Sequence, residues 1–220
     1  LTLLENGGEF FPALQAAIDA AEAEIFLETY IFANDETGHA IAAALRRAAG
    51  RGVTVRLMVD GFGGREFVAE LMDELTAGGV NVLIYRREVT TLSLRRHRLR
   101  RLHRKLAVID GRVAFVGGIN IISDFDEPTL AAPRQDYSVR VTGPLLGPIH
   151  GSVTRVWELV SWASFRKRRR LPASPPVFPE PCGDVEAAFL IRDNLRHRRD
   201  IEDAYLLAFA TARREIVLAN

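Results

Sequence analysis

The sequence feature that most limits the fold is a regular alternation of helix-like and strand-like segments in the first 86 residues. Helix-like segments carry apolar residues at helical spacing, whereas "IFLETYIF" and "VTVRLMVDG" are short apolar runs typical of strands. Such alternation, with short glycine turns, is typical of βαβ units. We therefore expect an α/β fold in which helices flank a mixed, mainly parallel sheet. The expected helices cover 9–24, 38–52 and 66–79, and the expected strands cover 25–32, 53–61 and 80–86.

The middle of the chain predicts a hairpin, a further strand and a long helix. "KLAVID" and "VAFVGG" flank Asp110-Gly111, a dipeptide that favours a tight hairpin turn. "DYSVRVTGP", residues 136–144, reads as another strand. Residues 144–165 read as a helix in which we expect Trp157 and Trp162 to pack into the core.

The chain divides into one long domain, a linker and an incomplete second unit. We expect the first domain to cover 1–165 and a linker rich in proline and arginine to cover 166–183. In 184–220, a helix, a small-residue turn and Glu215-Ile216-Val217-Leu218 repeat the order of the segment that ends in Glu24-Ile25-Phe26-Leu27. We therefore expect the last segment to be the start of a second repeat that is cut off at Asn220.

Composition points to an ordinary globular protein with clustered basic charge. Apolar residues make up 48% and charged residues 26%, while the formal net charge is only +1. One cysteine, Cys182, cannot form an internal disulfide, which suits a reducing compartment. Basic residues gather in 95–105 and in "RKRRR" at 166–170. Either run could face an anionic lipid or a nucleic acid, or could be a solvated loop.

The stretch "HRKLAVID", from His103 to Asp110, carries the chemistry. On a strand His103 and Lys105 would share a face, because successive side chains alternate. An imidazole beside an ammonium suits a phosphate, since the lysine neutralises a nonbridging oxygen while an imidazole nitrogen attacks phosphorus. Like-charge repulsion from Lys105 also favours the neutral, nucleophilic imidazole. We expect Asp110, at the strand end, to support the turn and local hydrogen bonding.

Several neighbouring residues are candidates for a supporting role. Gly117 and Gly118 end the next expected strand and would let a ligand approach the backbone, and Asn120 would add an amide donor. Asp136 is the candidate carboxylate for orienting His103 and stabilising its imidazolium. Glu28 lies inside an expected strand and either points into the site or pairs with an arginine.

"HRKLAVID" followed by "GGIN" resembles the HKD motif of the phospholipase D superfamily, His-x-Lys-x4-Asp with a downstream Gly-Gly and Asn. "FLETYIF", "RGVTVRLMVDGFG", "QDYSVRVTGP" and "ARREIVLAN" are similar, in order and spacing, to the bacterial cardiolipin synthases of that superfamily, particularly their B type. The resemblance covers essentially the whole chain and implies a phospholipase D-like fold.

The resemblance also implies an activity. Such enzymes transfer a phosphatidyl group between phospholipid alcohols through a phosphohistidine intermediate, without a redox cofactor or a metal. The implied catalytic residues are His103, Lys105 and Asp110, and the implied partners are phospholipids, with phosphatidylglycerol as the expected substrate, and an anionic membrane surface. Nucleic acid is a less favoured partner. The implied location is the cytoplasmic face of a bacterial membrane, bound peripherally.

The chain departs from the family pattern in one respect. Family members carry two HKD motifs, and the second histidine serves as general acid for the leaving group. Here the other histidines, His39, His97, His150 and His197, have no lysine two residues later. We expect truncation to explain this, whereas a homodimer that completes the site is the less favoured explanation. Two other functions stay open, a phosphodiesterase acting on nucleic acid and a non-catalytic lipid-binding half.

Overall fold

The computed structural model describes residues 1–86, 101–125, 133–164, 180, 185–192 and 197–217. It divides into two compact units, Leu1–Val185 and Glu186–Asn220, each of which is described here by itself. Apart from Glu180, the expected linker at 166–183 lies outside the described residues, as do Cys182 and the basic residues 95–100.

The first unit is built on one mixed sheet in the order β1-β7-β6-β5-β2-β3-β4. β2 lies inside this sheet between β5 and β3, and all six of its residues are buried. The mixed sheet of the expected α/β fold is therefore present. The strands are β1 (Thr2–Glu5), β2 (Glu24–Thr29), β3 (Thr54–Asp60), β4 (Asn81–Tyr85), β5 (Lys105–Ile109), β6 (Val113–Gly117) and β7 (Tyr137–Val141).

Parallel pairing is confined to one half of the sheet. β2 pairs with β3 and β3 with β4 in parallel, as the βαβ pattern predicts. The pairings β2–β5, β5–β6, β6–β7 and β1–β7 are antiparallel. The expectation of a mainly parallel sheet is corrected in this detail, because the hairpin β5–β6 adds to β2 in the opposite direction. β1, which the sequence patterns did not predict, closes the edge beside β7.

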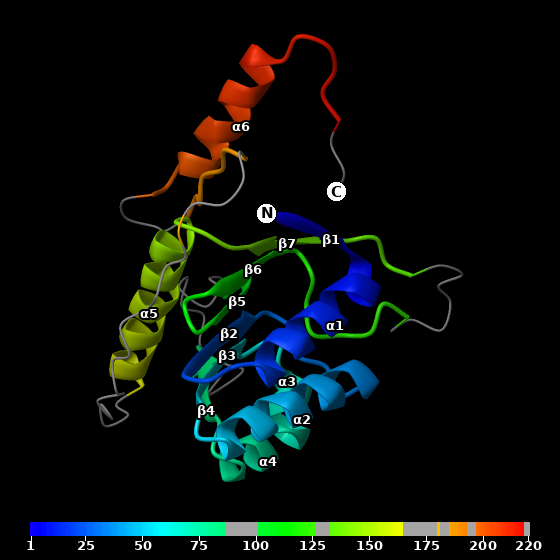
Figure 1. Ribbon diagram of the computed structural model, residues 1–220, viewed down its shortest axis with the longest axis vertical. Helices are drawn as coiled ribbons and strands as arrows, with labels where there is room; N and C mark the ends of the chain where they lie inside the picture. The colour runs from blue at the N-terminus through cyan, green and yellow to red at the C-terminus, as the bar shows by residue number, and fades with distance from the viewer. Residues whose placement is uncertain (87–100, 126–132, 165–179, 181–184, 193–196, 218–220) are drawn as a thin grey trace, which may run out of the picture. The chain divides into compact units, whose positions relative to one another are not determined.

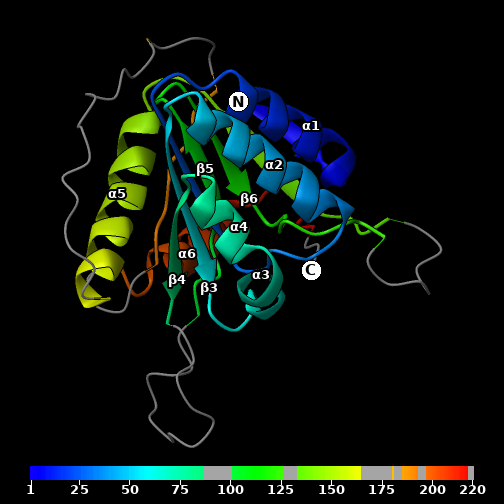
Figure 2. The same ribbon diagram turned by 90° about the horizontal axis from the view of Figure 1, so that it is seen from below.

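Helices cover both faces of the sheet. Figures 1 and 2 show α1 (Asn6–Asp19), α2 (Glu36–Gly50) and α4 (Met72–Ala77) on one face and α5 (Leu146–Ala163) on the other. The helix expected at 66–79 is two short helices, α3 (Arg65–Glu70) and α4, separated at Leu71, whose φ of −113° departs from helical geometry.

The two faces of the sheet differ in chemistry. The α1 and α2 face is an apolar core that includes Leu14, Ile18 and Leu45. On the α5 face, Trp157 is 9% exposed and packs edge-on against Phe26, with 6.5 Å between the ring centroids. Trp162 is 70% exposed, contrary to expectation. Five residues turn a helix by about 140° beyond a full turn, so the two tryptophans cannot share the face that meets the sheet.

The second unit contains α6 (Asp200–Thr211), which begins with three acidic residues in its first turn. The side chains of Tyr205, Leu206, Leu207 and Phe209 are all exposed by more than a third. Residues 215–217 form no strand, although the repeat pattern predicts one, because a strand needs a hydrogen-bonding partner and the described part of this unit offers none. No helix among the described residues of the chain is long and apolar enough to span a bilayer.

Asp110 fixes the hairpin against the start of β2. Its carboxylate accepts hydrogen bonds from the backbone N–H groups of Glu22, Ala23 and Glu24, each at 2.8 Å, while its own N–H donates to the Glu24 carbonyl at 2.9 Å. Asp110 and Gly111 both have positive φ, at 51° and 61°, as a type I′ hairpin turn requires. The carboxylate therefore aligns β5 with β2.

We predict that Asp110→Ala lowers the free energy of unfolding by about 2–4 kcal/mol, because three backbone donors lose their acceptor and alanine is strained at positive φ. Asp110→Asn should cost less, since asparagine keeps one acceptor oxygen and tolerates this conformation. Urea denaturation of the three proteins measures both losses. Equal stability of Asp110→Ala and wild type would contradict the anchoring role.

Candidate active site

His103 and Lys105 meet at the entrance to β5, where the motif predicts. His103 is exposed and precedes the strand, and Lys105 is the first residue of β5, paired with Gly117 of β6. The Lys105 Nζ atom lies 3.2 Å from His103 Nδ1 and donates to the His103 carbonyl oxygen at 3.0 Å. The ammonium and the imidazole thus share one small region of surface.

The electrostatic surroundings favour a neutral imidazole. Partial burial and the charge of Lys105 lower the pKa of His103 below its usual range, with Asp60 acting in the opposite direction. Burial also lowers the pKa of Lys105, and the Asp136 carboxylate opposes that shift. A histidine with a lowered pKa has its nitrogen lone pair available at neutral pH, as a nucleophile needs.

Tyr30 packs against His103 and was missed by sequence reasoning. The ring centroids lie 4.9 Å apart at an interplanar angle of 41°, and the Lys105 Nζ atom lies 5.5 Å from the Tyr30 centroid. Tyr30 directly follows β2, whose antiparallel pairing places Glu28 opposite Leu106. Only that pairing reveals the contact, because Tyr30 and His103 are far apart in the sequence.

Asp136 is held beside Lys105. Its backbone exchanges hydrogen bonds with Asn6, and its carboxylate accepts from the Tyr137 N–H at 2.7 Å. It acts electrostatically on Lys105, and no hydrogen bond joins it to His103 in the described part of the chain. Asp136 is therefore placed to balance the lysine, rather than in the expected position of a carboxylate that orients the imidazole. The carboxylate whose charge acts on His103 is that of Asp60.

Gly117, the last residue of β6, and Gly118, which follows it, are needed for protein packing. A Cβ at Gly117 would lie 2.4 Å from the Tyr137 carbonyl oxygen, and one at Gly118 would lie 2.2 Å from an Asp136 carboxylate oxygen. Both positions are closed by β7 and the residue before it, whereas the sequence suggested space for a ligand. The glycines let Asp136 approach the end of β6 closely.

Asn120 joins the segment after β2 to the segment after β6. Its side-chain oxygen accepts a hydrogen bond from the Ile31 N–H at 3.0 Å, and Ile121 exchanges backbone hydrogen bonds with Ile31 and Ala33. The amide oxygen thus has a structural task. The expected contribution of Asn120 to phosphate binding would have to come from its amide nitrogen.

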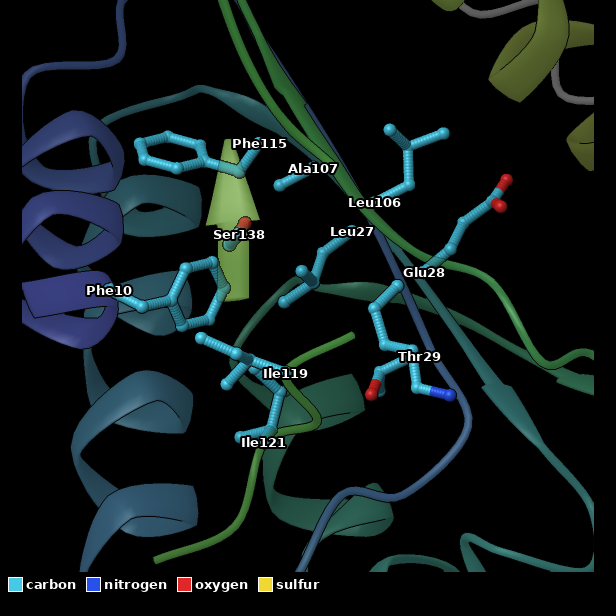
Figure 3. Close-up of a pocket in the computed structure, with 11 residues that line it drawn as sticks. Phe10, Leu27, Glu28, Thr29, Leu106, Ala107, Phe115, Ile119, Ile121 and Ser138 are labelled. Atoms are coloured by element: carbon cyan, nitrogen blue, oxygen red, sulfur yellow. The ribbon is translucent and has the colours of Figure 1, made fainter. Parts of the chain in front are cut away.

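Glu28 is buried on the α5 face of the sheet, opposite the face that α1 and α2 cover. Figure 3 shows its side chain, with that of Leu106, directed away from Phe10 and Phe115. It forms an ion pair with Arg104, with 2.7 Å between Oε2 and Nε, but neither carboxylate oxygen has a well-aligned hydrogen-bond donor in the described structure. Burial therefore outweighs the arginine and raises the pKa of Glu28 to about 7. Of the two expectations for Glu28, the structure shows the arginine pair.

Neither Asp110 nor a group of metal ligands adds to the His103–Lys105 site. Asp110 lies at the far end of β5 from Lys105, about 16 Å along an extended strand, so its position is that of a structural anchor and not of a catalytic group. Among the described residues, no three histidine, cysteine, aspartate or glutamate side chains are grouped so that they could hold a metal ion.

We predict a pH-dependent stability difference between wild type and Glu28→Gln. The folded-state pKa of about 7 exceeds the unfolded value of 4.5, so the contribution of Glu28 is full below pH 4.5 and is lost as pH rises through 7. The free energy of unfolding of wild type, relative to Glu28→Gln, should fall by roughly 3 kcal/mol between pH 4 and pH 8. Urea denaturation across this range measures it, and a constant difference would refute the burial argument.

Comparison with known proteins gives close relatives along the whole chain. Cardiolipin synthase B of Salmonella typhi is 40% identical over 222 residues, which cover 100% of this chain and 52% of that protein. Cardiolipin synthase B of Escherichia coli K12 is 36% identical over 220 residues, with the same shares covered. The chain therefore spans about half the length of the curated relatives it matches.

Solved structures share the fold. Nuc from Salmonella typhimurium, a phospholipase D family member, matches with a TM-score of 0.54 and 21% identity over 74% of this chain and 93% of that chain. NucT from Helicobacter pylori matches with a TM-score of 0.54 and 17% identity over 72% and 93%. At these identities the likeness concerns the fold alone.

A family model described as "Cardiolipin synthase, PLD-like domain" matches residues 14–124, half of the chain. The matched segment runs from α1 past β6, so it includes β2, the His103–Lys105 pair and Asn120. The fold, the geometry at the entrance to β5 and this match agree, and the chain belongs to the phospholipase D-like domain family of the cardiolipin synthases.

Proposed function

We propose that this chain carries the nucleophile of a cardiolipin synthase-like phosphatidyltransferase, which moves a phosphatidyl group between phospholipid alcohols. The observation that carries the proposal is the His103–Lys105 pair, with 3.2 Å between Nζ and Nδ1, inside a domain of this family. The names of the relatives support the lipid substrate class. Phosphatidylglycerol is the proposed donor, and its headgroup the proposed acceptor.

The proposed chemistry has two displacements. An imidazole nitrogen of His103 attacks phosphorus, a P–N bond forms, and the P–O bond to the leaving alcohol breaks as that oxygen takes a proton from a general acid. A second alcohol then loses its proton and attacks phosphorus, and the P–N bond breaks. Lys105 stabilises the charge that develops on the phosphoryl oxygens, as cationic donors do in such transition states.

The neighbours of the pair have supporting roles in this proposal. Tyr30 limits the rotation of the His103 ring through the 4.9 Å contact. Asp136 holds the charge of Lys105 in place, because its carboxylate favours the ammonium form. The Asn120 amide nitrogen would bind a phosphoryl oxygen. Together they would preorganise the nucleophile and the phosphate clamp before substrate arrives.

We further propose that residues 184–220 begin a second repeat that supplies the general acid. With Glu215 aligned on Glu24, the α6 positions Ile201, Tyr205 and Phe209 correspond to Phe10, Leu14 and Ile18 of α1. These three α1 residues are buried in the core of the first unit. Tyr205 and Phe209 are exposed in their own unit, as expected of a helix whose apolar stripe requires a sheet of its own.

The proposed site of action is the cytoplasmic face of a bacterial membrane, where the protein would bind peripherally to anionic lipid. The basic residues at 95–105 and the interfacial substrate support this location. Neither a metal nor a redox cofactor enters the proposed steps. The net charge of +1 gives no general attraction to a polyanion such as nucleic acid.

In the full-length protein, we predict that His103→Ala lowers phosphatidyl transfer by at least about 10³-fold while the fold is kept, because the exposed nucleophile is removed. The measurement is cardiolipin formation from phosphatidylglycerol vesicles, with circular dichroism to verify folding. Arg112→Ala is the matched control, since Arg112 is a surface residue that pairs with Glu22 at the other end of the hairpin.

Wild-type turnover by His103→Ala would contradict the nucleophile assignment. If wild type cleaved plasmid DNA and left the lipids unchanged, the nucleic-acid phosphodiesterase would replace the transferase. Vesicle binding without any product would favour the non-catalytic lipid-binding half.

A second prediction concerns the pKa of His103. Lys105→Met removes a positive charge next to the imidazole and should raise this pKa, because the protonated form is then less disfavoured. Lys105→Arg keeps the charge and should leave the pKa low. Histidine NMR titration of the three proteins measures the shift, and an unchanged or lower pKa in Lys105→Met would show that the lysine does not hold the imidazole neutral.

A further inference from the structure

Two arginine side chains pack against an exposed aromatic ring next to the candidate active site. Phe62, in the loop after β3, is 41% exposed. The guanidinium carbons of Arg65 and Arg101 lie over its ring, 4.3 and 4.4 Å from the centroid, within the range of cation–π contacts. One ring thus brings together two guanidinium groups from segments that are distant in the sequence. We name Phe62, Arg65 and Arg101 the aromatic–arginine cluster.

A buried carboxylate fixes both segments that carry this cluster. Asp60 is 0% exposed, and its side chain accepts hydrogen bonds from the N–H groups of Phe62 at 2.8 Å and Gly63 at 3.3 Å. Its other oxygen accepts from the Leu102 N–H at 2.7 Å. Leu102 lies between Arg101 and His103. Asp60 therefore fixes the position of the cluster relative to that of the candidate nucleophile.

The loop that carries Phe62 also packs against Tyr30. A Cβ at Gly63 would lie 2.5 Å from the Tyr30 carbonyl oxygen, which shows how closely this loop approaches Tyr30. The Tyr30 ring in turn contacts the imidazole of His103. Two separate routes, through Asp60 and through Tyr30, therefore place the aromatic–arginine cluster beside the reacting histidine.

We propose that the aromatic–arginine cluster is a docking site for the phosphate headgroup of an anionic phospholipid in the bilayer, separate from the phosphate attacked by His103. Planar guanidinium groups match phosphate oxygens and stay charged at every physiological pH. The exposed part of the ring suits the boundary between headgroups and acyl chains, where aromatic side chains are favoured. The inference rests on the proposed function, because it adds a second lipid contact to that site.

The cluster favours a lipid over a nucleic acid. Single-stranded nucleic acids bind to aromatic faces through base stacking. Here two guanidinium groups lie over the Phe62 ring, which leaves little of its faces for a base. Arg65 and part of the Phe62 ring are exposed, so the cluster presents positive charge beside an apolar edge, which suits an anionic headgroup next to acyl chains. A nucleic acid is therefore the rival outcome of the test.

The test is binding of the full-length protein to phosphatidylcholine vesicles with and without phosphatidylglycerol, measured by co-sedimentation. We expect R65Q/R101Q to bind phosphatidylglycerol vesicles about 30-fold more weakly than wild type, since each basic group at an anionic surface contributes roughly a five-fold factor. R112Q removes an exposed arginine away from the cluster and should stay within about twofold. Thermal unfolding verifies that each variant is folded.

Three outcomes would overturn the proposal. The first is unchanged vesicle binding by R65Q/R101Q, and the second is an equal loss in R112Q, which would indicate general charge attraction. The third is a loss of binding to a single-stranded oligonucleotide with vesicle binding intact. Vesicle binding is measured without turnover. If wild type formed no cardiolipin, the proposed function would be refuted, whereas the binding test of the aromatic–arginine cluster would still give its answer.

A ring-preserving variant tests the same site without removing charge. In F62W the indole takes the place of Phe62, and its fluorescence, taken as the difference from wild type, should shift to the blue when phosphatidylglycerol vesicles are added. Soluble glycerophosphoglycerol and inorganic phosphate should produce no such shift, because neither brings an apolar phase to the ring. An unchanged difference spectrum with the vesicles would place the ring outside the lipid contact and overturn the proposal.

Discussion

The antiparallel pairing of β2 with β5 is the interaction on which the candidate site depends. It places Ile25 opposite Ile109 and Glu28 opposite Leu106, and so brings the residue after β2, Tyr30, to the entrance of β5. A slip of one residue would exchange the two faces of β5 and move His103 and Lys105 together away from Tyr30. Asp110 prevents such a slip by binding three consecutive backbone N–H groups before and at the start of β2.

Charge around the site is arranged in opposed pairs on the two faces of the sheet. Arg104 turns to the α5 face and pairs with Glu28, so its charge is partly balanced there. Lys105 and His103 meet at the entrance to β5, with Asp136 acting on the lysine and Asp60 on the histidine. The result is a cationic clamp beside a neutral imidazole, the arrangement that attack on a phosphodiester requires.

The sequence predicted those parts of the fold and site that local patterns encode. Asp110-Gly111 predicted the hairpin, and the spacing of His103 and Lys105 predicted their proximity. It did not reveal the edge strand β1, the contact of Tyr30 with His103, or the hydrogen bonds by which Asp60 joins the loop after β3 to Leu102. These features depend on pairings between distant segments. The sequence could not show whether the Asp136 side chain points toward His103 or toward Lys105, because β7 and its neighbours determine that direction. Trp162 shows the same limit within one helix, because an apolar residue type does not determine which face it occupies.

The most direct test of the central claim is to look for the covalent intermediate. The full-length protein would be mixed with phosphatidylglycerol, quenched in alkali within one turnover and digested, and the peptides would be analysed by mass spectrometry. The account predicts a phosphatidyl group, or the glycerophosphoryl group that remains after alkali removes its acyl chains, bonded to the imidazole of His103 through a P–N bond that survives alkali and breaks in acid. Turnover with the group on another residue, or with no covalent adduct at all, would contradict it.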